Sequence, residues 1–147
     1  MKAEQIFSIV NLIAIFSWLL LAIFPTWKYT RHLVLSGAIP LLLSVAYLAL
    51  IVLFFGSAEG GFGSLAGVMK LFTNEWAVLA GWIHYLAFDL FVGSWEVQDS
   101  QRRGISHILV IPCLFLTFMF GPIGFLLYSG IKLYMMRKGG EDDLETA

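Results

Sequence analysis

Of the 147 residues, 59% are hydrophobic and only 13% are charged, a composition that is too apolar for an ordinary soluble domain and predicts an integral membrane protein. Nine basic and ten acidic residues give a net charge of -1, so there is no basic excess to neutralise phosphates, which argues against nucleic-acid binding. The single cysteine, Cys113, excludes an intrachain disulfide and a cysteine-based metal site.

Two apolar segments in the first half of the chain are long enough to cross a membrane, which takes about 20 residues of α-helix. The first is expected at residues 6–24 and ends before Pro25. The second is expected at residues 33–55 and contains Pro40, where a proline removes a backbone hydrogen bond and tends to kink a helix.

A connector is expected at residues 56–74, because five glycines together with Glu59 and Lys70 make this segment too polar and too broken to span. It is expected to end in a short interfacial helix around residues 65–72. Two interpretations stay open for it, a flexible linker and a lid over a site below.

The third span is expected at residues 76–97, and a fourth apolar segment begins near residue 105 and continues to Lys132. Pro112 and a Gly-Pro pair at 121–122 interrupt the fourth segment, yet each half would be too short to cross alone, which favours one kinked and tilted helix. Four spans place both chain ends on the same side and divide the basic residues almost equally, so the positive-inside rule leaves the orientation open.

These elements predict an all-α fold, a four-transmembrane-helix bundle at residues 1–140 with the glycine-rich connector between its second and third helices. Residues 141–147 form an acidic tail that is expected to be disordered. Small residues such as Gly81, Gly93 and Gly121 permit close contacts between helices, either within one chain or in a homo-oligomer.

Ionisable side chains are concentrated between residues 82 and 107, in and just after the third span. They are His84, Asp89, Glu96, Asp99, Arg102, Arg103 and His107. A charged side chain near the middle of a bilayer costs about 2.5 to 3.5 kcal/mol on insertion scales, so it usually faces a polar partner, a cavity or a substrate. This segment is therefore the candidate functional site.

A helical projection at about 100° per residue places several of these side chains on one side of the third span. That side carries Tyr85, Asp89, Glu96, Asp99 and His84. The turn at 102–104 is expected to bring His107 back towards it. An acid, a base and a cation in apolar surroundings suit proton transfer, because such surroundings favour the protonated form of a carboxyl group.

No helical metal-ligand spacing is present in this set, which disfavours a metal cage, although a two-histidine haem site formed by His84 with His107 or His32 stays open. A structural interpretation also stays open, in which Asp89 and His84 hold helices together by hydrogen bonds. The charged residues at 96–103 would then be a solvated turn, and the tryptophans would be interfacial anchors.

Ordered motifs continue from Trp82 to Tyr128. They are Trp-x-His at 82–84, Asp-Leu-Phe at 89–91, Gly93, Asp99, Arg-Gly at 103–104, His107, Pro112, Thr117, Phe-Gly-Pro at 120–122, Gly124 and Tyr128. In this pattern the segment resembles a family of small membrane proteins, the neoxanthin synthase-like, abscisic-acid-deficient-type proteins of plants and their bacterial relatives. In plants this family is implicated in converting violaxanthin into neoxanthin, an isomerisation that opens an epoxide and creates an allene without net redox change.

The resemblance implies a catalytic site lined by Asp89, His84, His107, Asp99 and Arg103. Asp89 is the candidate acid and His84 or His107 the candidate base. Arg103 with Asp99 would order the turn or stabilise oxyanion charge. Substrate contacts are expected from Trp82, Tyr85, Trp95, Glu96, Phe120 and Tyr128.

The leading hypothesis is a membrane-embedded isomerase that acts on a carotenoid or similar polyene by acid-base catalysis, with no cofactor. The alternatives are a non-catalytic binding or assembly module for a pigment, quinone or haem, and a transporter subunit with a proton relay. The expected partners are the lipid membrane and the polyene ligand. Because the chain carries no Ser- and Arg-rich transit peptide, it is expected in a bacterial inner membrane, or in a plastid envelope as a mature plant form.

Overall fold

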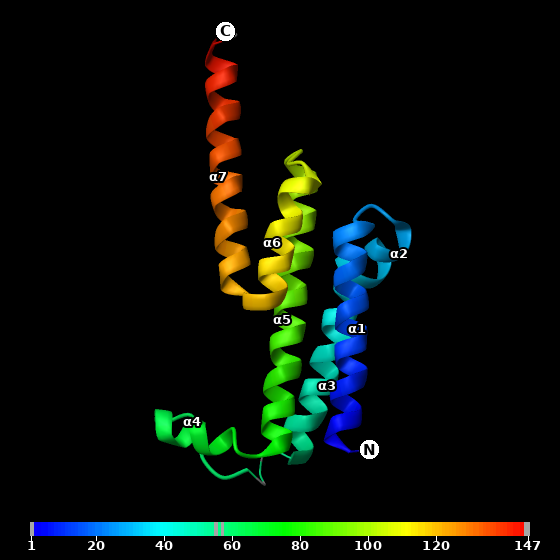
Figure 1. The fold of residues 1–147 in the computed structure, drawn as a ribbon, viewed down its shortest axis with the longest axis vertical. Coiled ribbons are helices and arrows are strands. Elements are labelled where there is room, and N and C mark those ends of the chain that lie inside the picture. The colour runs from blue at the N-terminus through cyan, green and yellow to red at the C-terminus, as the bar shows by residue number, and fades with distance from the viewer. Residues whose placement is uncertain (1, 55, 57, 146–147) are drawn as a thin grey trace.

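A computed structural model describes residues 2–54, 56 and 58–145, with side chains up to residue 137. The described residues form helices joined by turns, and no strand occurs among them (Figure 1). Three helical segments in this part of the chain are long and apolar enough to cross a membrane. They are Ala3–Ile23, Lys28–Phe54 and Glu75–Arg102. The all-α prediction is confirmed, whereas the expected fourth span is not among these segments.

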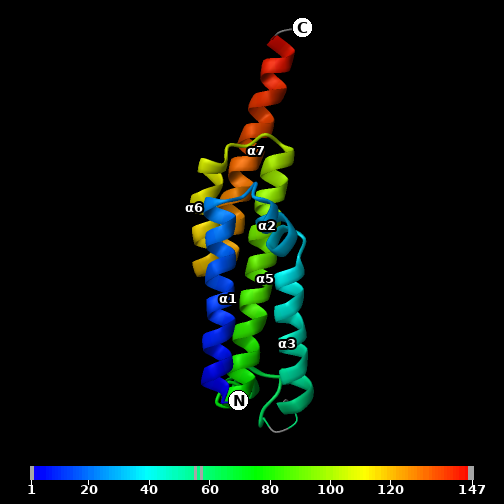
Figure 2. The ribbon, with the colours of Figure 1, turned by 90° about the vertical axis from the view of Figure 1, so that its right-hand side faces the viewer.

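The first and third predicted spans are helices α1 (Ala3–Ile23) and α5 (Glu75–Arg102). The 21 residues of α1 rise about 32 Å, close to the thickness of the hydrocarbon core. Helix α5 begins where the side chain of Asn74 accepts hydrogen bonds from two free backbone N–H groups of its first turn. It continues five residues beyond the predicted end at residue 97, and it contacts α1, α3, α6 and α7 (Figure 2).

The second segment consists of a single turn, α2 (Lys28–Thr30), a π-helix, η1 (Arg31–Leu35), and α3 (Ala38–Phe54). Gly37 separates η1 from α3 with a φ of 83°, a conformation that favours glycine. Pro40 lies in the first turn of α3, where its missing N–H group has no helical partner to lose. Pro40 therefore breaks no helical hydrogen bond, and the reason for expecting a kink at this residue does not apply.

Between α3 and α5, helix α4 (Leu65–Leu71) is the short helix expected in the connector. The side chain of Ser64 caps it by accepting a hydrogen bond from the backbone N–H of Gly67. Residues 55 and 57 lie outside the described residues, and the flexibility of the connector stays a prediction.

The fourth apolar segment reverses direction, so the prediction of one kinked helix is wrong. Helix α6 (His107–Phe120) and helix α7 (Pro122–Glu145) form an antiparallel hairpin beside the upper half of α5 (Figure 1). Gly121 makes the reversal with a φ of 48°, and Pro122 suits the first position of a helix. The 14 residues of α6 rise only about 21 Å, too short to cross the hydrocarbon core.

Because three segments cross the length of the molecule and the hairpin returns to its starting end, the N- and C-termini lie at opposite ends (Figures 1 and 2). The expectation that both ends share one side is therefore wrong. Residues 141–145, which were expected to be disordered, form the end of α7. Residues 146–147 of the expected tail lie outside the described residues. The division into one domain and a tail stays a prediction.

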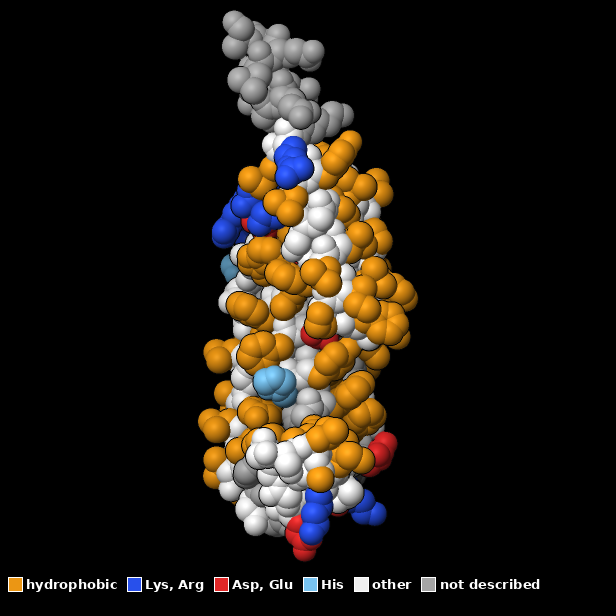
Figure 3. Space-filling model, turned by 90° about the vertical axis from the view of Figure 1, so that its left-hand side faces the viewer, with side chains coloured by type: hydrophobic (Ala, Val, Ile, Leu, Met, Phe, Trp, Pro, Cys, Tyr) orange, Lys and Arg blue, Asp and Glu red, His pale blue; other side chains and the backbone are white. Residues whose placement is uncertain are grey.

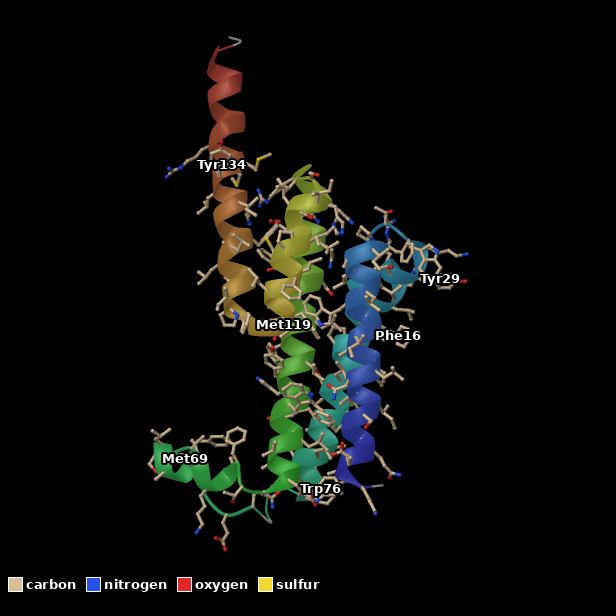
Figure 4. All side chains as sticks on the ribbon, viewed as in Figure 1. Phe16, Tyr29, Met69, Trp76, Met119 and Tyr134 are labelled. Carbon is tan, nitrogen blue, oxygen red and sulfur yellow. The ribbon has the colours of Figure 1, made fainter. Side chains whose placement is uncertain are left out.

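Glycines allow two close helix contacts, one between α5 and α1 and one within the α6–α7 hairpin. A Cβ atom at Gly93 would lie 2.6 Å from two ring atoms of Trp18 on α1. A Cβ atom at Gly124 would overlap the backbone and hydroxyl of Thr117, so α7 packs directly on α6. Elsewhere large apolar side chains point outward, as Phe16 does on α1 (Figure 4), which suits a surface that faces lipid.

The corrected topology predicts a membrane orientation. Six described basic residues lie on segments that approach the end of α5, on the side from which α7 extends to the C-terminus (Figure 1): Lys28, Arg31, Arg102, Arg103, Lys132 and Arg137. Only Lys2 and Lys70 lie near the other end. Since Lys and Arg are enriched on the cytoplasmic side, we expect the C-terminus in the cytoplasm of a bacterial host and the N-terminus outside it.

Reporter proteins fused to each end of the chain in a bacterial host test the predicted orientation. A fluorescent protein that matures only in the cytoplasm should be bright at the C-terminus and dark at the N-terminus, and a phosphatase that is active only outside should give the reverse. Signals from both ends on the same side would contradict the three-span topology.

Candidate functional site

Three carboxylates of α5 lie on the side that the α6–α7 hairpin covers. They are Asp89, Glu96 and Asp99, spaced seven and three residues apart. Figure 1 shows the hairpin beside the upper half of α5, with its tip near the middle of that helix. The sequence correctly placed these acids on one face, and the hairpin gives each of them a different environment.

Asp99, nearest the membrane surface, is held by three donors. The Nε atom of Arg103 lies 2.9 and 3.0 Å from its two oxygens. From α7, the Nζ atom of Lys132 lies 3.1 Å from Oδ2, and the hydroxyl of Tyr128 donates to the same oxygen over 2.9 Å. Because α5 and α7 share these bonds, Asp99 fastens the hairpin to the long helix.

Glu96, one turn deeper, is fully buried. The hydroxyl of Thr117 on α6 lies 2.9 Å from Oε1 and 3.2 Å from Oε2. Gly124 on α7 packs directly against Thr117 and closes this contact from the other side. Glu96 is thus sealed between three helices, and no substrate could reach it without movement of the hairpin.

Asp89 lies near the middle of α5, under the tip of the hairpin, and is half-buried. A Cβ atom at Gly121 would lie 2.8 Å from its Oδ1, so glycine is required at the tip both by its φ and by this close approach. Its Oδ2 is buried and has no hydrogen-bond partner among the described residues. The hydroxyl of the neighbouring Tyr85 donates to the backbone carbonyl of Phe118.

The surface near this level is accessible from the side. Figure 3 shows a histidine and a carboxylate at mid-height, surrounded by hydrophobic side chains. His84 is exposed, and its ring lies against Phe88 at 4.6 Å between centroids and Tyr47 of α3 at 5.5 Å. His84 therefore lies on the α3 side of the exposed surface, and Asp89 on the hairpin side.

The structure does not bring His107 to the acids of α5, contrary to the expectation from the turn at 102–104. Its Nε2 atom donates to the carbonyl oxygen of Ala22 at 2.9 Å, which links the start of α6 to the end of α1. The side of α6 that faces α1 depends on where the two helices cross, and residue spacing along one helix does not contain that information.

The aromatic residues expected to contact substrate divide among three locations. Trp82 faces α1, where its Nε1 atom donates to Asn11 at 2.8 Å. Trp95 packs edge-on against the fully buried Tyr128 and lies 5.0 Å below the Lys132 ammonium group. Phe120 is exposed at the hairpin tip.

Two contributions were not predicted from the sequence, those of Lys132 and Asn11. Both are polar residues within apolar segments, and that rarity was the signal that could have identified them.

Among the residues that the structure describes, no group of three or more His, Cys, Asp or Glu side chains is placed to hold a metal ion.

A family model described as ABA DEFICIENT 4-like matches residues 5–128 of the chain. This match confirms the resemblance inferred from residues 82–128 and extends it through the first two spans. It ends at Tyr128, so it includes all three acids of α5 and the hairpin tip. Neither a curated protein nor a solved structure matches the chain.

The Thr117 contact predicts a stability difference between two conservative variants. Thr117→Val keeps the side-chain shape but removes the hydroxyl donor, which leaves buried Glu96 unsatisfied and should cost about 1 to 3 kcal/mol. Thr117→Ser keeps the hydroxyl and should lose less. Thermal unfolding in detergent measures both, and equal melting temperatures for the two variants would contradict the role assigned to the hydroxyl.

Proposed function

Because the match covers most of the chain, the protein belongs to the ABA DEFICIENT 4-like family, and from that membership we propose that it isomerises a carotenoid or similar polyene within the membrane. Family membership supports a neoxanthin synthase-like membrane protein in broad terms. The reaction, its substrate and its catalytic residues are our proposal. So is its location in a bacterial inner membrane or a plastid envelope.

The proposed reaction moves protons without net redox change. An acid gives a proton to the epoxide oxygen as its C–O bond breaks, and a base takes a proton from a carbon of the polyene. The electron pair of that C–H bond forms the new C=C bond of the allene, and the pair of the broken C–O bond stays on oxygen as a hydroxyl. All atoms of the substrate are kept, so no co-reactant is needed.

One observation supports Asp89 as the acid, namely that its Oδ2 has no hydrogen-bond partner among the described residues. The other two acids on this face are already engaged, since Asp99 accepts from three side chains and Glu96 is sealed beside Thr117. A carboxyl group must reach the substrate to transfer a proton. Asp89 is half-buried beside the accessible surface and is the acid best suited to that contact.

His84 is the better candidate for the base. It is exposed on the same surface, and it lies about 7.5 Å from Asp89 along the helix axis at 1.5 Å per residue. A long polyene lying across this surface could contact both side chains. His107 is less suited, because its Nε2 bonds to the carbonyl of Ala22 at the end of α1 and its ring lies away from the acids of α5. Arg103 and Asp99 would position the hairpin.

The competing proposal is a non-catalytic module that binds a pigment, quinone or haem. The bonds of Asp99 and Glu96 to the hairpin favour it, since they show polar side chains fastening helices together. An absorption spectrum of the purified protein separates the cases, because a bound carotenoid gives a structured blue band and haem gives a Soret band. A homo-oligomer stays an open prediction, tested by the mass of the detergent complex.

The catalytic proposal predicts the outcome of two substitutions in a host that makes an epoxidised carotenoid. Asp89→Asn removes the proton donor while keeping the side-chain volume, and His84→Ala removes the base. Each should lower the amount of isomerised pigment at least about 100-fold, the usual contribution of a general acid or base. Chromatography of the extracted pigments measures it.

Glu75→Gln is the matched control, because Glu75 lies in the first turn of α5 at the membrane surface and should leave conversion unchanged. All variants are compared at equal membrane levels. Unchanged pigment profiles for Asp89→Asn and His84→Ala would contradict the catalytic assignment, and a bound pigment with unchanged profiles would favour the binding module.

A further inference from the structure

Three adjoining pockets follow the groove between the second membrane segment and α5. The outer pocket has a volume of about 580 Å³ and is lined by Arg31, His32, Leu35, Ser36, Gln98, Gln101 and Arg102. A middle pocket of about 190 Å³ shares Leu35, Ser36, Gln98 and Arg102 with it. An inner pocket of about 420 Å³ shares Gly37 and Phe91 with the middle one. Together they form one continuous groove.

The outer end of the groove is positively charged. Arg31 and Arg102 approach it from opposite walls, and no carboxylate of the described residues pairs with either. The one acid of the groove, Asp99 in the middle pocket, is already bound by Arg103 and Lys132. Two uncompensated guanidinium groups at the membrane surface suit a phosphate, which arginine binds through a fork of N–H donors.

One wall of this outer end is a turn that hydrogen bonds fasten to α5. The turn that carries Arg31 is a π-helix. This wider helical turn is rare in proteins overall, and where it does occur it is often at a functional site. The side-chain amide of Gln98 donates to the carbonyl of Leu35 and ties this turn to α5, while that of Gln101 donates to the carbonyl of Pro25 in the preceding loop. The arginines are therefore presented by a braced segment.

The inner end of the groove is apolar. It is lined by Gly37, Pro40, Leu41, Ser44, Ala87, Phe88 and Phe91. The hydroxyl of Ser44 bonds to its own helix at the carbonyl of Pro40, so it offers no free donor to a ligand. A ligand in this groove would meet charge at the membrane surface and apolar side chains deeper down.

We propose that this groove is a binding site for an anionic phospholipid, with its phosphate between Arg31 and Arg102 and one acyl chain over Phe91 and Phe88. The charged end is the one that the basic residues assign to the cytoplasmic side, where anionic lipids attract basic segments. The site does not contain Asp89 and does not depend on the proposed isomerase activity.

Native mass spectrometry of the full-length, delipidated protein tests the proposal. Phosphatidylglycerol and phosphatidylcholine with identical acyl chains are added separately. The unmodified protein should retain one phosphatidylglycerol and bind it about tenfold or more tighter than phosphatidylcholine, since each basic residue near the surface contributes appreciably. The double variant Arg31→Gln/Arg102→Gln should lose this preference.

Arg137→Gln is the matched control, because it removes an exposed arginine near the same end of the molecule but outside the groove. It should keep the preference. Equal binding of the two lipids to the unmodified protein, or an unchanged preference in the double variant, would overturn the proposal.

A third variant separates a lipid from a free phosphate. Ser44→Phe fills the inner pocket without touching the arginines, so it should weaken phosphatidylglycerol binding. If Ser44→Phe leaves that binding unchanged and inorganic phosphate competes as well as the lipid does, the groove recognises phosphate alone and the lipid proposal fails. Pigment conversion is a separate readout, so either proposal can fail without the other.

Discussion

Carboxylates inside a membrane need hydrogen-bond donors, and in this protein the α6–α7 hairpin supplies them to α5. Water cannot satisfy a polar group in the hydrocarbon core, so the donors must come from the protein itself. Thr117 on α6 serves Glu96, while Tyr128 and Lys132 on α7 serve Asp99. The position of the hairpin follows from these pairs, and Asp89 is the acid of this face to which no side chain of the hairpin donates among the described residues.

Distance from the membrane surface along α5 then orders the three acids by availability. Asp99 is bound to three donors and Glu96 is sealed, whereas Asp89 lies beyond the last donor that the hairpin offers and keeps one oxygen without a partner. An unsatisfied buried oxygen is costly and calls for an explanation, of which a catalytic role is one. This gradient supports Asp89, ahead of the others, as the residue that would meet a substrate.

Much of this arrangement could be predicted from the sequence. Hydropathy locates α1 and α5 to within about five residues at each end, and a helical projection places Asp89, Glu96 and Asp99 on one face. Hydropathy could not predict the hairpin, because an apolar segment has the same hydropathy whether it crosses the membrane or turns back within it. The sequence feature that could have indicated the reversal is Gly121 followed by Pro122, a glycine that can end one helix and a proline that suits the start of the next. The contact of His107 with Ala22 depends on helix crossing, which no local pattern encodes.

The reversal at Gly121 is the claim on which the rest depends, and a distance measurement between spin labels tests it directly. Labels at Gln101 and Tyr134, both exposed, would be introduced after Cys113→Ala. Each label lies two residues from a contact between the end of α5 and α7, the one between Arg103 and Met136. The two labels should therefore lie within about 20 Å of each other, a distance typical of side chains on neighbouring helices. A distance of about 40 Å, the rise of one continuous helix over residues 105–132, would contradict the hairpin.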